Sequence, residues 1–423
     1  MIPDRPIVLI GFGKLVLAHL ERHASPGTVL VVEDPDILDK RSVPSEAARF
    51  ACVADVVPAR YHQDMQCVAE VRRRVGASGV LAVLPGLEYG VPAAAALADA
   101  LGRPGASPAA AACLTDKVEL RRAAALGGLR QPMWREVTGP ADVAEFAAGG
   151  EYVLKPANRH ASLGVQLLGP GDDVAAAWDR AVGARDDMML PRRELRWRYL
   201  VESRVVGVEH SAEAVVADGR VTFLNVTAKS VLPGRHPVEL GHLLPAPLPT
   251  DRHAAVAAAM DQLVAAVGFR TGLLHAEWML DAPGGEPLLI ECAGRAPGDS
   301  IVDLVDLAYG GSLIADVLGV LSGQPPAARR PPGRAAAVRF LTAPAGRVES
   351  VHGLDGARTL PGVVRASCSV GAGSLIGELR SSWDRIGEVV AVGPDAGSAA
   401  EQADRAARAV SVTLATADRA VSA

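Results

Sequence analysis

The sequence predicts a mixed α/β and α+β protein, with a parallel α/β layer at the N-terminus and a strand-rich part after it. In residues 1–106 short apolar strands alternate with helical segments, which is the pattern of a parallel sheet covered by helices. Beyond residue 150, several strands follow one another across short turns, which is typical of hairpins. A chain of 423 residues has room for two or three domains with cores of their own.

The N-terminal layer begins with an apolar strand at 6–11, an amphipathic helix and a second strand at 28–34. Gly11 and Gly13 are spaced as in the turn of a dinucleotide-binding fold, but Val16 stands where that motif has its third glycine. A structural turn between strand and helix is therefore favoured over a nicotinamide site.

The layer continues with a helix from about Gln63 to Val75, a strand at 79–86 and a helix that ends near a Gly-Pro stop. Glu88 comes just past the carboxyl end of that strand, where open α/β sheets place groups that contact ligands. Two interpretations of Glu88 stay open, because it either faces a substrate or caps the helix that follows.

A helical linker at 107–132 leads from this layer to the next strands and carries Lys117 early in its helix VELRRAAAL. The segment 151–168 predicts two strands, with Lys155 at the end of the first and a loop that closes on Ser162-Leu163-Gly164. A loop of exposed N–H groups between two strands can fold over phosphates, with the lysine as a point charge. The sequence contains no GxxxxGK[ST] motif, so this is not a P-loop.

The middle of the chain predicts strands around 202–206, 210–217 and 220–229, the last two joined by an Asp-Gly turn. The segment 238–248 has the composition of a loop, and a helix is expected over 251–267.

Two strands, 273–280 and 287–292, are expected to form a hairpin around the turn 283–285. If the hairpin is symmetric about the middle of that turn, Glu277 and Glu291 lie opposite each other on one face. Two facing carboxylates repel and weaken a sheet, and a divalent cation between them removes the penalty. Two solvated glutamates are the alternative, but the strands are too apolar for an exposed hairpin to be favoured.

The C-terminal third predicts two helices within 300–323, a Pro/Arg-rich linker at 323–334 and then mostly short strands. The expected elements after the linker are strands in 335–344, 346–353 and 386–393 and a closing helix over 398–410.

Charge and cysteine content limit the class of protein. A net charge of −5 gives no electrostatic reason to expect nucleic acid as a partner. The five cysteines are scattered and lack CxxC spacing, which predicts reduced thiols and a cytoplasmic location rather than disulfides or a zinc site. We also expect no signal peptide before the first strand and, because charged residues break the apolar helices, no segment that spans a membrane.

Lysine is scarce in this chain, so the position of each lysine gives information about a possible function. Arginine supplies nearly all positive charge, so a lysine is expected where a compact and flexible ammonium is needed. The chain has only five lysines: Lys14, Lys40, Lys117, Lys155 and Lys229.

Several of these features occur together in one order: Lys117, Lys155 with its loop, VESRVVGVE (201–209), HAEW (275–278) and IECAGRAPGD (290–299). This order resembles the ATP-grasp superfamily of carboxylate–amine ligases, and most of all the L-amino-acid ligases. The resemblance covers roughly Val29 to the end of the chain. It includes a strand-rich segment near the C-terminus, PGVVRASCSVGAGSLIGELRSSWDRIGEVVAVG (361–393).

The resemblance implies three domains. Residues 1–106 would form an N-terminal pre-ATP-grasp α/β domain and residues 107–330 the ATP-grasp core. Within the core, 107–200 would include a small lid and 201–330 the hinge and metal-binding part. Residues 331–423 would form a strand-rich subdomain that completes the fold.

The resemblance also implies a role for each matching residue. Glu202, Ser203 and Val205 would form the adenine hinge, and Glu209 would bind the ribose. Glu277 and Glu291 would hold Mg²⁺, for which Mn²⁺ could substitute. Lys155 and Arg295 would be the catalytic residues, Lys155 by contacting the ATP phosphates and Arg295 by binding the transferred phosphate and the tetrahedral intermediate. The expected ATP-binding residues are Lys117, Lys155, Ser162, Gly164, Glu202, Ser203, Val205 and Glu209.

The expected substrate-binding residues are Glu88, Glu239, His242, Arg295 and Asp299. Glu239 and His242 fall where L-amino-acid ligases place groups that bind an amino acid, although a loop histidine bonded to the backbone is an equal alternative for His242. An acid at Asp299 would favour an acceptor substrate with a cationic or hydroxyl group.

One position departs from the family pattern. Many ATP-grasp enzymes have asparagine two residues after the second metal-binding glutamate, and here that residue is Ala293. A second metal ion would therefore lack a side-chain ligand or take water in its place, so the number of ions stays open.

The expected activity is an ATP-dependent ligase that phosphorylates a carboxylate and joins the acyl phosphate to an amine, giving an amide or dipeptide with ADP and phosphate. Both substrates are expected to be small molecules, amino acids first among them, and ligases of this kind often form homodimers. Three rivals stay open: another ATP-grasp reaction such as carboxylation, a non-enzymatic ATP-binding protein, and a nicotinamide dehydrogenase that rests on the Gly11–Gly13 turn alone.

Overall fold

The structure is a computed structural model that describes residues 5–76, 79–146, 150–232, 234, 237–281, 285–328 and 331–415. The chain divides into two compact units. The first unit consists of Met1–Val226, Leu248–Val302 and Gly311–Arg329. The second consists of Thr227–Pro247, Asp303–Gly310 and Arg330–Ala423. The three-domain division expected from the sequence stays a prediction.

The N-terminal part of the first unit is a parallel sheet of order β3-β2-β1-β4, as the alternating pattern predicted. The inner strands β1, β2 and β4 are apolar and largely buried, whereas the edge strand β3 is partly exposed. Residues of α4 and α5 share one core cluster with the sheet, and α12 also contacts β4. The strands are β1 (Ile7–Ile10), β2 (Val29–Glu33), β3 (Val53–Pro58) and β4 (Ala82–Pro85). The helices are α1 (Lys14–Leu20), α2 (Pro35–Lys40), α3 (Val43–Ala47), α4 (Gln66–Val75), a 3₁₀ turn (Glu88–Gly90) and α5 (Val91–Ala100).

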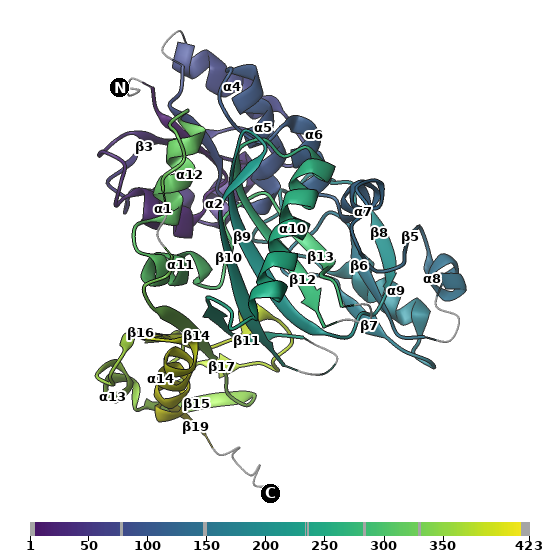
Figure 1. The fold of residues 1–423 in the computed structure, drawn as a ribbon, viewed down its shortest axis with the longest axis vertical. Helices are drawn as coiled ribbons and strands as arrows, with labels where there is room; N and C mark the ends of the chain where they lie inside the picture. Colours follow the sequence, from purple (N-terminus) through teal and green to yellow (C-terminus); the bar gives the residue numbers. More distant parts are fainter. Residues whose placement is uncertain are drawn as a thin grey trace, which may run out of the picture. The chain divides into compact units, whose positions relative to one another are not determined.

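A second, antiparallel sheet of order β5-β8-β6-β7 also belongs to the first unit. Helices α8 and α9 lie beside it and pack against β5 and β6 (Figure 1). The strands are β5 (Trp134–Val137), β6 (Tyr152–Pro156), β7 (Gln166–Leu168) and β8 (Tyr199–Ser203). The sequence did not single out β5, α8 (Pro140–Phe146) or α9 (Val174–Gly183), because each is short.

A third sheet of the first unit has the order β13-β12-β9-β10. Helix α10 packs against β9 and against α6 and α7 (Figure 1). The predicted linker helix is thus two helices, α6 (Pro108–Leu114) and α7 (Lys117–Leu126). The other elements are β9 (Val208–Ala217), β10 (Arg220–Val231), α10 (Thr250–Val267), β12 (Gly272–Leu280), β13 (Leu288–Ala293) and α12 (Leu313–Leu321).

The hairpin of β12 and β13 places Glu277 directly opposite Glu291, as predicted. The assumed symmetry is nevertheless wrong beyond this pair, because Trp278 pairs with Leu289 and leaves Ile290 as an extra residue. This β-bulge lets Leu289 be buried beside Trp278 while Glu291 still faces Glu277. The turn residues 282–284 lie outside the described part of the chain.

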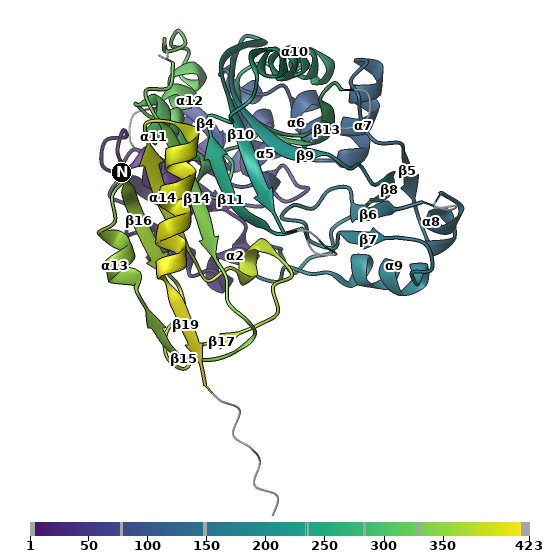
Figure 2. The same cartoon turned by 60° about the horizontal axis from the view of Figure 1, so that its bottom comes forward.

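The second unit is built on strands of order β11-β14-β18-β16, with the end of β10 next to β11. Helix α14 (Ala396–Ala409) lies along β14 and β18 (Figure 2). The strands are β11 (Glu239–Leu244), β14 (Ala335–Leu341), β16 (Val363–Cys368) and β18 (Gly387–Gly393). A small sheet of order β17-β15-β19 uses Leu375–Ile376, Gly346–His352 and Ser411–Leu414, and α13 spans Leu354–Arg358.

The prediction of a loop over 238–248 is wrong, because β11 occupies most of it. Polar residues and a glycine interrupt its apolar pattern. Pairing with β10 on one side and β14 on the other holds the strand in place instead.

Helix α11 (Ile301–Tyr309) contains a boundary between the two units. Within the described residues no single helix is long and apolar enough to cross a membrane, and only the bent pair of α11 and α12 reaches that length and composition.

Candidate active site

Lys117 contacts one of the two facing glutamates of the hairpin. It is the first residue of α7, and its Nζ lies 2.7 Å from Oε1 of Glu291. The same Nζ donates a hydrogen bond of 2.8 Å to the carbonyl oxygen of Arg159, in the loop after β6. The start of α7, the end of β13 and the loop after β6 therefore meet at one ammonium group.

Glu277, the other facing glutamate, lies beside a partly buried histidine, His275, that the sequence analysis did not select. Nε2 of His275 is 3.7 Å from Oε1 of Glu277, and its Nδ1 is 3.0 Å from Oε1 of Glu213. Burial lowers the pKa of His275, but hydrogen bonds and charge from Glu213 and Glu277 outweigh it and raise the pKa to about 9. Glu213 is fully buried and also accepts hydrogen bonds from Ser211 and Asn225.

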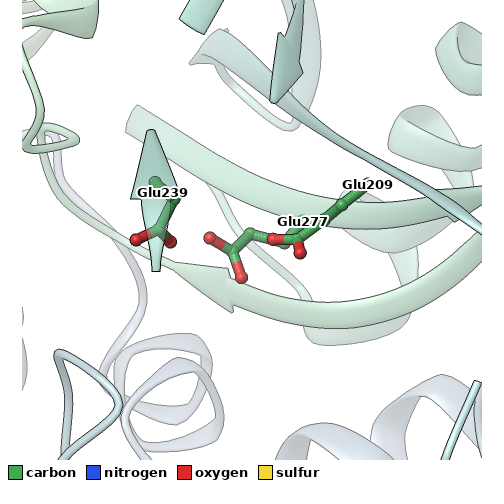
Figure 3. A group of neighbouring side chains, drawn as sticks. All are labelled: Glu209, Glu239 and Glu277. Carbon is green, nitrogen blue, oxygen red and sulfur yellow. The ribbon is translucent and has the colours of Figure 1, made fainter. Parts of the chain in front are cut away.

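The residues around Glu277 suit a hard divalent cation. Glu277 and Glu291 offer carboxylate oxygens from neighbouring strands, and a carboxylate oxygen of Glu209 lies within 4.8 Å of one of Glu277 (Figure 3). Oxygen donors of this kind are the ligands that Mg²⁺ prefers. Glu239, also drawn in Figure 3, lies on β11 of the second unit.

Lys155 is held by a buried ion pair. Its Nζ lies 2.6 Å from Oε2 of Glu202, and Nε of Arg121 donates a hydrogen bond of 2.6 Å to Oε1 of the same carboxylate. Burial raises the pKa of Glu202, but the adjacent Lys155 and Arg121 outweigh it and hold the pKa at about 2. The Glu202 side chain is thus fixed as an anion between two cations.

Arg121 was missed by the sequence analysis, although a signal was present. In α7 it lies three residues after Val118 and three before Ala124, both of which are buried. Its guanidinium also donates to the carbonyl oxygens of Leu289 and Ile290, at 3.1 and 2.6 Å. Arg121 therefore binds the bulge of β13 immediately before Glu291, as well as Glu202.

The loop between β6 and β7 adopts a strained backbone where phosphate contacts were expected. Ala161 and Ser162 have φ values of 57° and 55°, and Gly164 has a φ of 82°. A Cβ on Gly164 would lie 2.9 Å from the carbonyl oxygen of Ala181, so glycine is required there by both conformation and space. Burial lowers the pKa of His160 in this loop to about 3, with nearby Arg295 and Lys117 adding to the effect, so its imidazole is neutral.

The expected adenine hinge lies at the end of β8. The N–H of Ser203 donates to the carbonyl oxygen of Met133 at 2.9 Å, and the Ser203 hydroxyl accepts from the Met133 N–H at 3.1 Å. Ser203 therefore pairs with the chain before β5, while Val205 follows in the connection to β9.

Arg295 and Glu88 form an ion pair, although they are 207 residues apart in sequence. Nε of Arg295 donates to Oε2 of Glu88 at 2.7 Å, and its Nη1 donates to the carbonyl oxygen of Ala296 at 2.8 Å. The edge of the parallel sheet is thereby joined to the segment after β13. Asp299, four residues further on, has a φ of 55°.

Glu88, Lys117 and Glu291 line one cavity of about 270 Å³ in the first unit, whereas Lys155, Glu277 and Arg295 are not among its lining residues. Its walls come from the edge of the parallel sheet, the start of α7, the loop after β6, the segment before β8 and the end of β13. The charged lining residues are Glu88, Asp116, Lys117, Arg159, Arg196, Arg198 and Glu291.

Two predicted substrate residues, Glu239 and His242, lie in the second unit. The Glu239 carboxylate is 3.5 Å from Nζ of Lys229 and accepts a hydrogen bond of 2.7 Å from the hydroxyl of Ser382. His242 is buried, and its ring lies edge-on to the ring of Phe340. The guanidinium of Arg385 lies 3.7 Å from the centre of the Phe340 ring. Lys229 and Arg385 were not predicted, although the scarcity of lysine pointed to Lys229.

The turn after β1 has the close packing of a structural turn, the interpretation that the sequence favoured over a nicotinamide site. A Cβ on Gly13 would collide with the carbonyl oxygen of Gly86, so glycine permits the close packing of the turns after β1 and β4. Glu33, fully buried at the end of β2, accepts hydrogen bonds from the N–H of Phe12 and the hydroxyl of Tyr61. The acid that would bind a ribose in a dinucleotide fold thus stabilises the turn itself.

Two family models match the chain. An ATP-grasp domain matches residues 149–303, which include Lys155, Glu202, Glu277 and Glu291. An L-amino acid ligase C-terminal domain 2 matches residues 339–415.

Solved structures share the fold over nearly the whole chain. L-amino acid ligase from Bacillus licheniformis has a TM-score of 0.81 and 20% sequence identity, covering 98% of this chain and 99% of that chain. Carboxyaminoimidazole ribonucleotide synthase from Aspergillus clavatus has a TM-score of 0.72 at 15% identity, with 96% and 98% covered. Phosphoribosylglycinamide synthetase from Anaerococcus prevotii has a TM-score of 0.69 at 15% identity, with 98% and 100% covered. At these identities the likeness concerns the fold.

A relative in Sinorhizobium fredii (strain NBRC 101917 / NGR234), the uncharacterized protein y4rH, is 29% identical over 303 residues. The match covers 70% of this chain and spans 60% of that relative's length.

Residues 149–303 thus match an ATP-grasp domain, and the chain shares its fold with an L-amino acid ligase of known structure. It also carries the C-terminal domain of L-amino acid ligases. The resemblance to ATP-grasp ligases, and most of all to L-amino-acid ligases, is therefore confirmed.

Proposed function

We propose that this protein is an ATP-dependent ligase that activates the carboxylate of an amino acid as an acyl phosphate and joins it to the amine of a second amino acid. The products are an amide or dipeptide, ADP and phosphate. The observation that carries the proposal is the pair of facing glutamates, Glu277 and Glu291, with Lys117 at 2.7 Å from Glu291.

The reaction needs positioning and charge neutralisation more than covalent catalysis. A carboxylate is a poor electrophile, and transfer of the γ-phosphoryl group of ATP to it creates a phosphate leaving group that an amine can displace. Lys117, Lys155 and Arg295 supply positive charge for the phosphates. Mg²⁺ held by Glu277 and Glu291 adds charge neutralisation when it is bound.

The surrounding residues support these roles. Glu202 and Arg121 fix the position of Lys155 in a buried network, so the ammonium stays where it is needed. The planar fork of Arg295 suits a phosphoryl group and a tetrahedral intermediate better than a lysine would. The loop after β6, with its strained residues and Gly164, would exclude water from the acyl phosphate.

The other predicted residues keep their proposed roles. The segment Glu202–Val205 would bind adenine through its backbone and Glu209 the ribose, with Ser162 and Gly164 over the phosphates. Glu88, Glu239, His242 and Asp299 would bind the amino acids. Mn²⁺ as a substitute metal, a homodimer and a cytoplasmic location also belong to the proposal.

The test is incubation with ATP, MgCl₂ and pairs of amino acids, read by ADP release and by mass spectrometry of the condensed product. We expect ADP release that depends on both amino acids. Glu277→Gln and Glu291→Gln should lower it about a hundredfold or more, whereas Glu349→Gln, an exposed acid on β15, should leave it unchanged. Full turnover in either hairpin variant contradicts the proposal. ADP release that needs bicarbonate instead of an amino acid would assign the chain to carboxylation.

A further inference from the structure

Arg159 is a buried arginine in the loop after β6 to which nothing above assigns a function. Its residue is 6% exposed, and its guanidinium lies 4.3 Å from the centre of the Trp197 ring. Nη1 donates a hydrogen bond to the carbonyl oxygen of Ala184. Nε is buried and has no hydrogen-bond partner within the described part of the chain.

The charge of Arg159 is not balanced by an acid of its own. Two other cations of the cavity have acidic partners: Lys117 pairs with Glu291, and Arg198 pairs with Asp116, Glu119 and Glu136. Arg196 also lines the cavity, but its side chain is exposed. Among the described residues no carboxylate lies within 4.0 Å of the Arg159 guanidinium. A buried cation without a counter-charge is costly, so such a group is expected where a ligand supplies the negative charge.

The surroundings of Arg159 connect it to the proposed site. It lines the 270 Å³ cavity together with Glu88, Tyr89 and Lys117. Its own carbonyl oxygen accepts the hydrogen bond from Lys117 Nζ, so its backbone position is tied to a residue proposed to contact phosphates. The stacking on Trp197 holds the guanidinium plane in one orientation and leaves its Nε donor unused.

We propose that Arg159 binds an oxyanion that enters this cavity, either the carboxylate of the amino-acid substrate or a phosphoryl group of the nucleotide. The inference deepens the proposed function, on which it rests, by naming the recognition residue for a negative group of a ligand in the same site. A guanidinium suits this purpose because it can bind both oxygens of a carboxylate or phosphoryl group at once.

The experiment compares wild type with Arg159→Gln, Arg159→Lys and a matched control, Arg185→Gln, which removes an exposed arginine of the same region. Calorimetry measures the affinity for Mg-ADP and for the non-hydrolysable analogue Mg-AMPPNP. Titration in the presence of Mg-AMPPNP measures the affinity for each amino acid and for its C-terminal amide, which lacks the negative charge. Thermal unfolding shows whether each variant is folded. If Arg159→Gln does not fold, Arg159→Lys, which keeps the positive charge, takes its place in the comparison.

A loss of about tenfold or more in one of these affinities is expected for Arg159→Gln, because a charge-assisted hydrogen bond contributes that much. If the oxyanion is the substrate carboxylate, the amino acid binds more weakly, its amide is unaffected and nucleotide affinity is kept. If the oxyanion is a phosphoryl group, nucleotide affinity falls and the preference for acid over amide remains. In either case Arg159→Lys restores part of the loss and Arg185→Gln shows none.

Affinities within twofold of wild type in Arg159→Gln, or an equal loss in Arg185→Gln, would overturn the inference. Failure of the proposed function looks different, because the wild type would then bind no nucleotide or release no ADP with any amino acid. Arg159 is in that case tested by titration with inorganic phosphate and acetate, read by Trp197 fluorescence against a Trp197→Phe control. A response that persists unchanged in Arg159→Gln also overturns the inference.

Discussion

Among the described residues, several buried charges are paired with a counter-charge. Glu202 is the clearest case, because one buried carboxylate neutralises both Lys155 and Arg121. This network of three groups therefore stabilises the fold only while all three are charged.

Glu202→Gln should destabilise the protein by about 3–5 kcal/mol, because it leaves two buried cations without a partner. The measurement is the free energy of unfolding in denaturant at pH 7. Glu136→Gln is the control, since this half-exposed acid pairs with Arg198 at the surface and should cost about 1 kcal/mol or less. Equal losses in the two variants would show that burial does not set the strength of the Glu202 network.

The stability that Glu202 contributes should depend on pH in one direction. Its pKa is about 2 in the folded protein, below the 4.5 of a free glutamate side chain, which is expected for the unfolded chain. The contribution is therefore fully present above pH 4.5 and is lost as the pH falls from 4.5 towards 2. The difference in unfolding free energy between wild type and Glu202→Gln, measured at pH 7 and pH 3, should shrink at pH 3. A difference that stays constant would mean that folding does not lower the pKa of Glu202.

At the scale of single elements, the conformation of the loop after β6 requires a glycine at position 164, whereas Gly171, in the turn after β7, serves as a comparison. Gly164 and Gly171 both have a positive φ, of 82° and 86°, but only Gly164 lies against another part of the chain. Gly164→Ala should weaken Mg-ADP binding because the loop must move, and should lose about 1 kcal/mol of stability. Gly171→Ala should lose similar stability and keep nucleotide affinity. Calorimetry and thermal unfolding of both variants separate the two effects, and equal nucleotide affinities would exclude a special role for Gly164.

The sequence predicts elements well where apolar periodicity is strong and poorly where polar residues interrupt it. The parallel strands β1, β2 and β4 were predicted because they are continuous apolar runs. Strand β11 was missed because Glu239, Gly241 and His242 break its pattern, and only its pairing with two neighbours explains it. Local pattern does not contain that information.

The candidate site shows the same division. The facing glutamates were predicted because a hairpin brings together residues close in sequence. The contact of Arg295 with Glu88 joins two predicted residues whose pairing the sequence did not predict, because it depends on the packing of separate elements. Arg159 was missed because in an arginine-rich chain only burial distinguishes it from surface residues, whereas the position of Arg121 on the buried face of α7 could have been read from its helical spacing.

On the scale of the whole molecule, the second unit is assembled from three separate stretches of chain. Strand β11, from the stretch Thr227–Pro247, is hydrogen-bonded to β14, from the stretch that begins at Arg330. The second unit therefore cannot be removed by a single cut.

A chain that ends at residue 328 should lose solubility, because β11 would present an unpaired edge. A chain that ends at Ala415 keeps every described residue and should behave as the full chain. Soluble yield and the thermal midpoint compare the two. A well-folded protein ending at residue 328 would show that β11 does not need β14.

The bulge of β13 has a consequence for protein engineering. In the register set by Trp278 and Leu289, an uninterrupted ladder would pair Ile290 with Glu277 and turn Glu291 towards the opposite side. The extra residue shifts the register by one, so that Glu291 pairs with Glu277. The guanidinium of Arg121, in a helix more than 160 residues upstream, donates hydrogen bonds to the carbonyl oxygens of Leu289 and Ile290. A hybrid made by transplanting the hairpin alone would carry the two acids but not their alignment, so the helix and the hairpin have to be exchanged together.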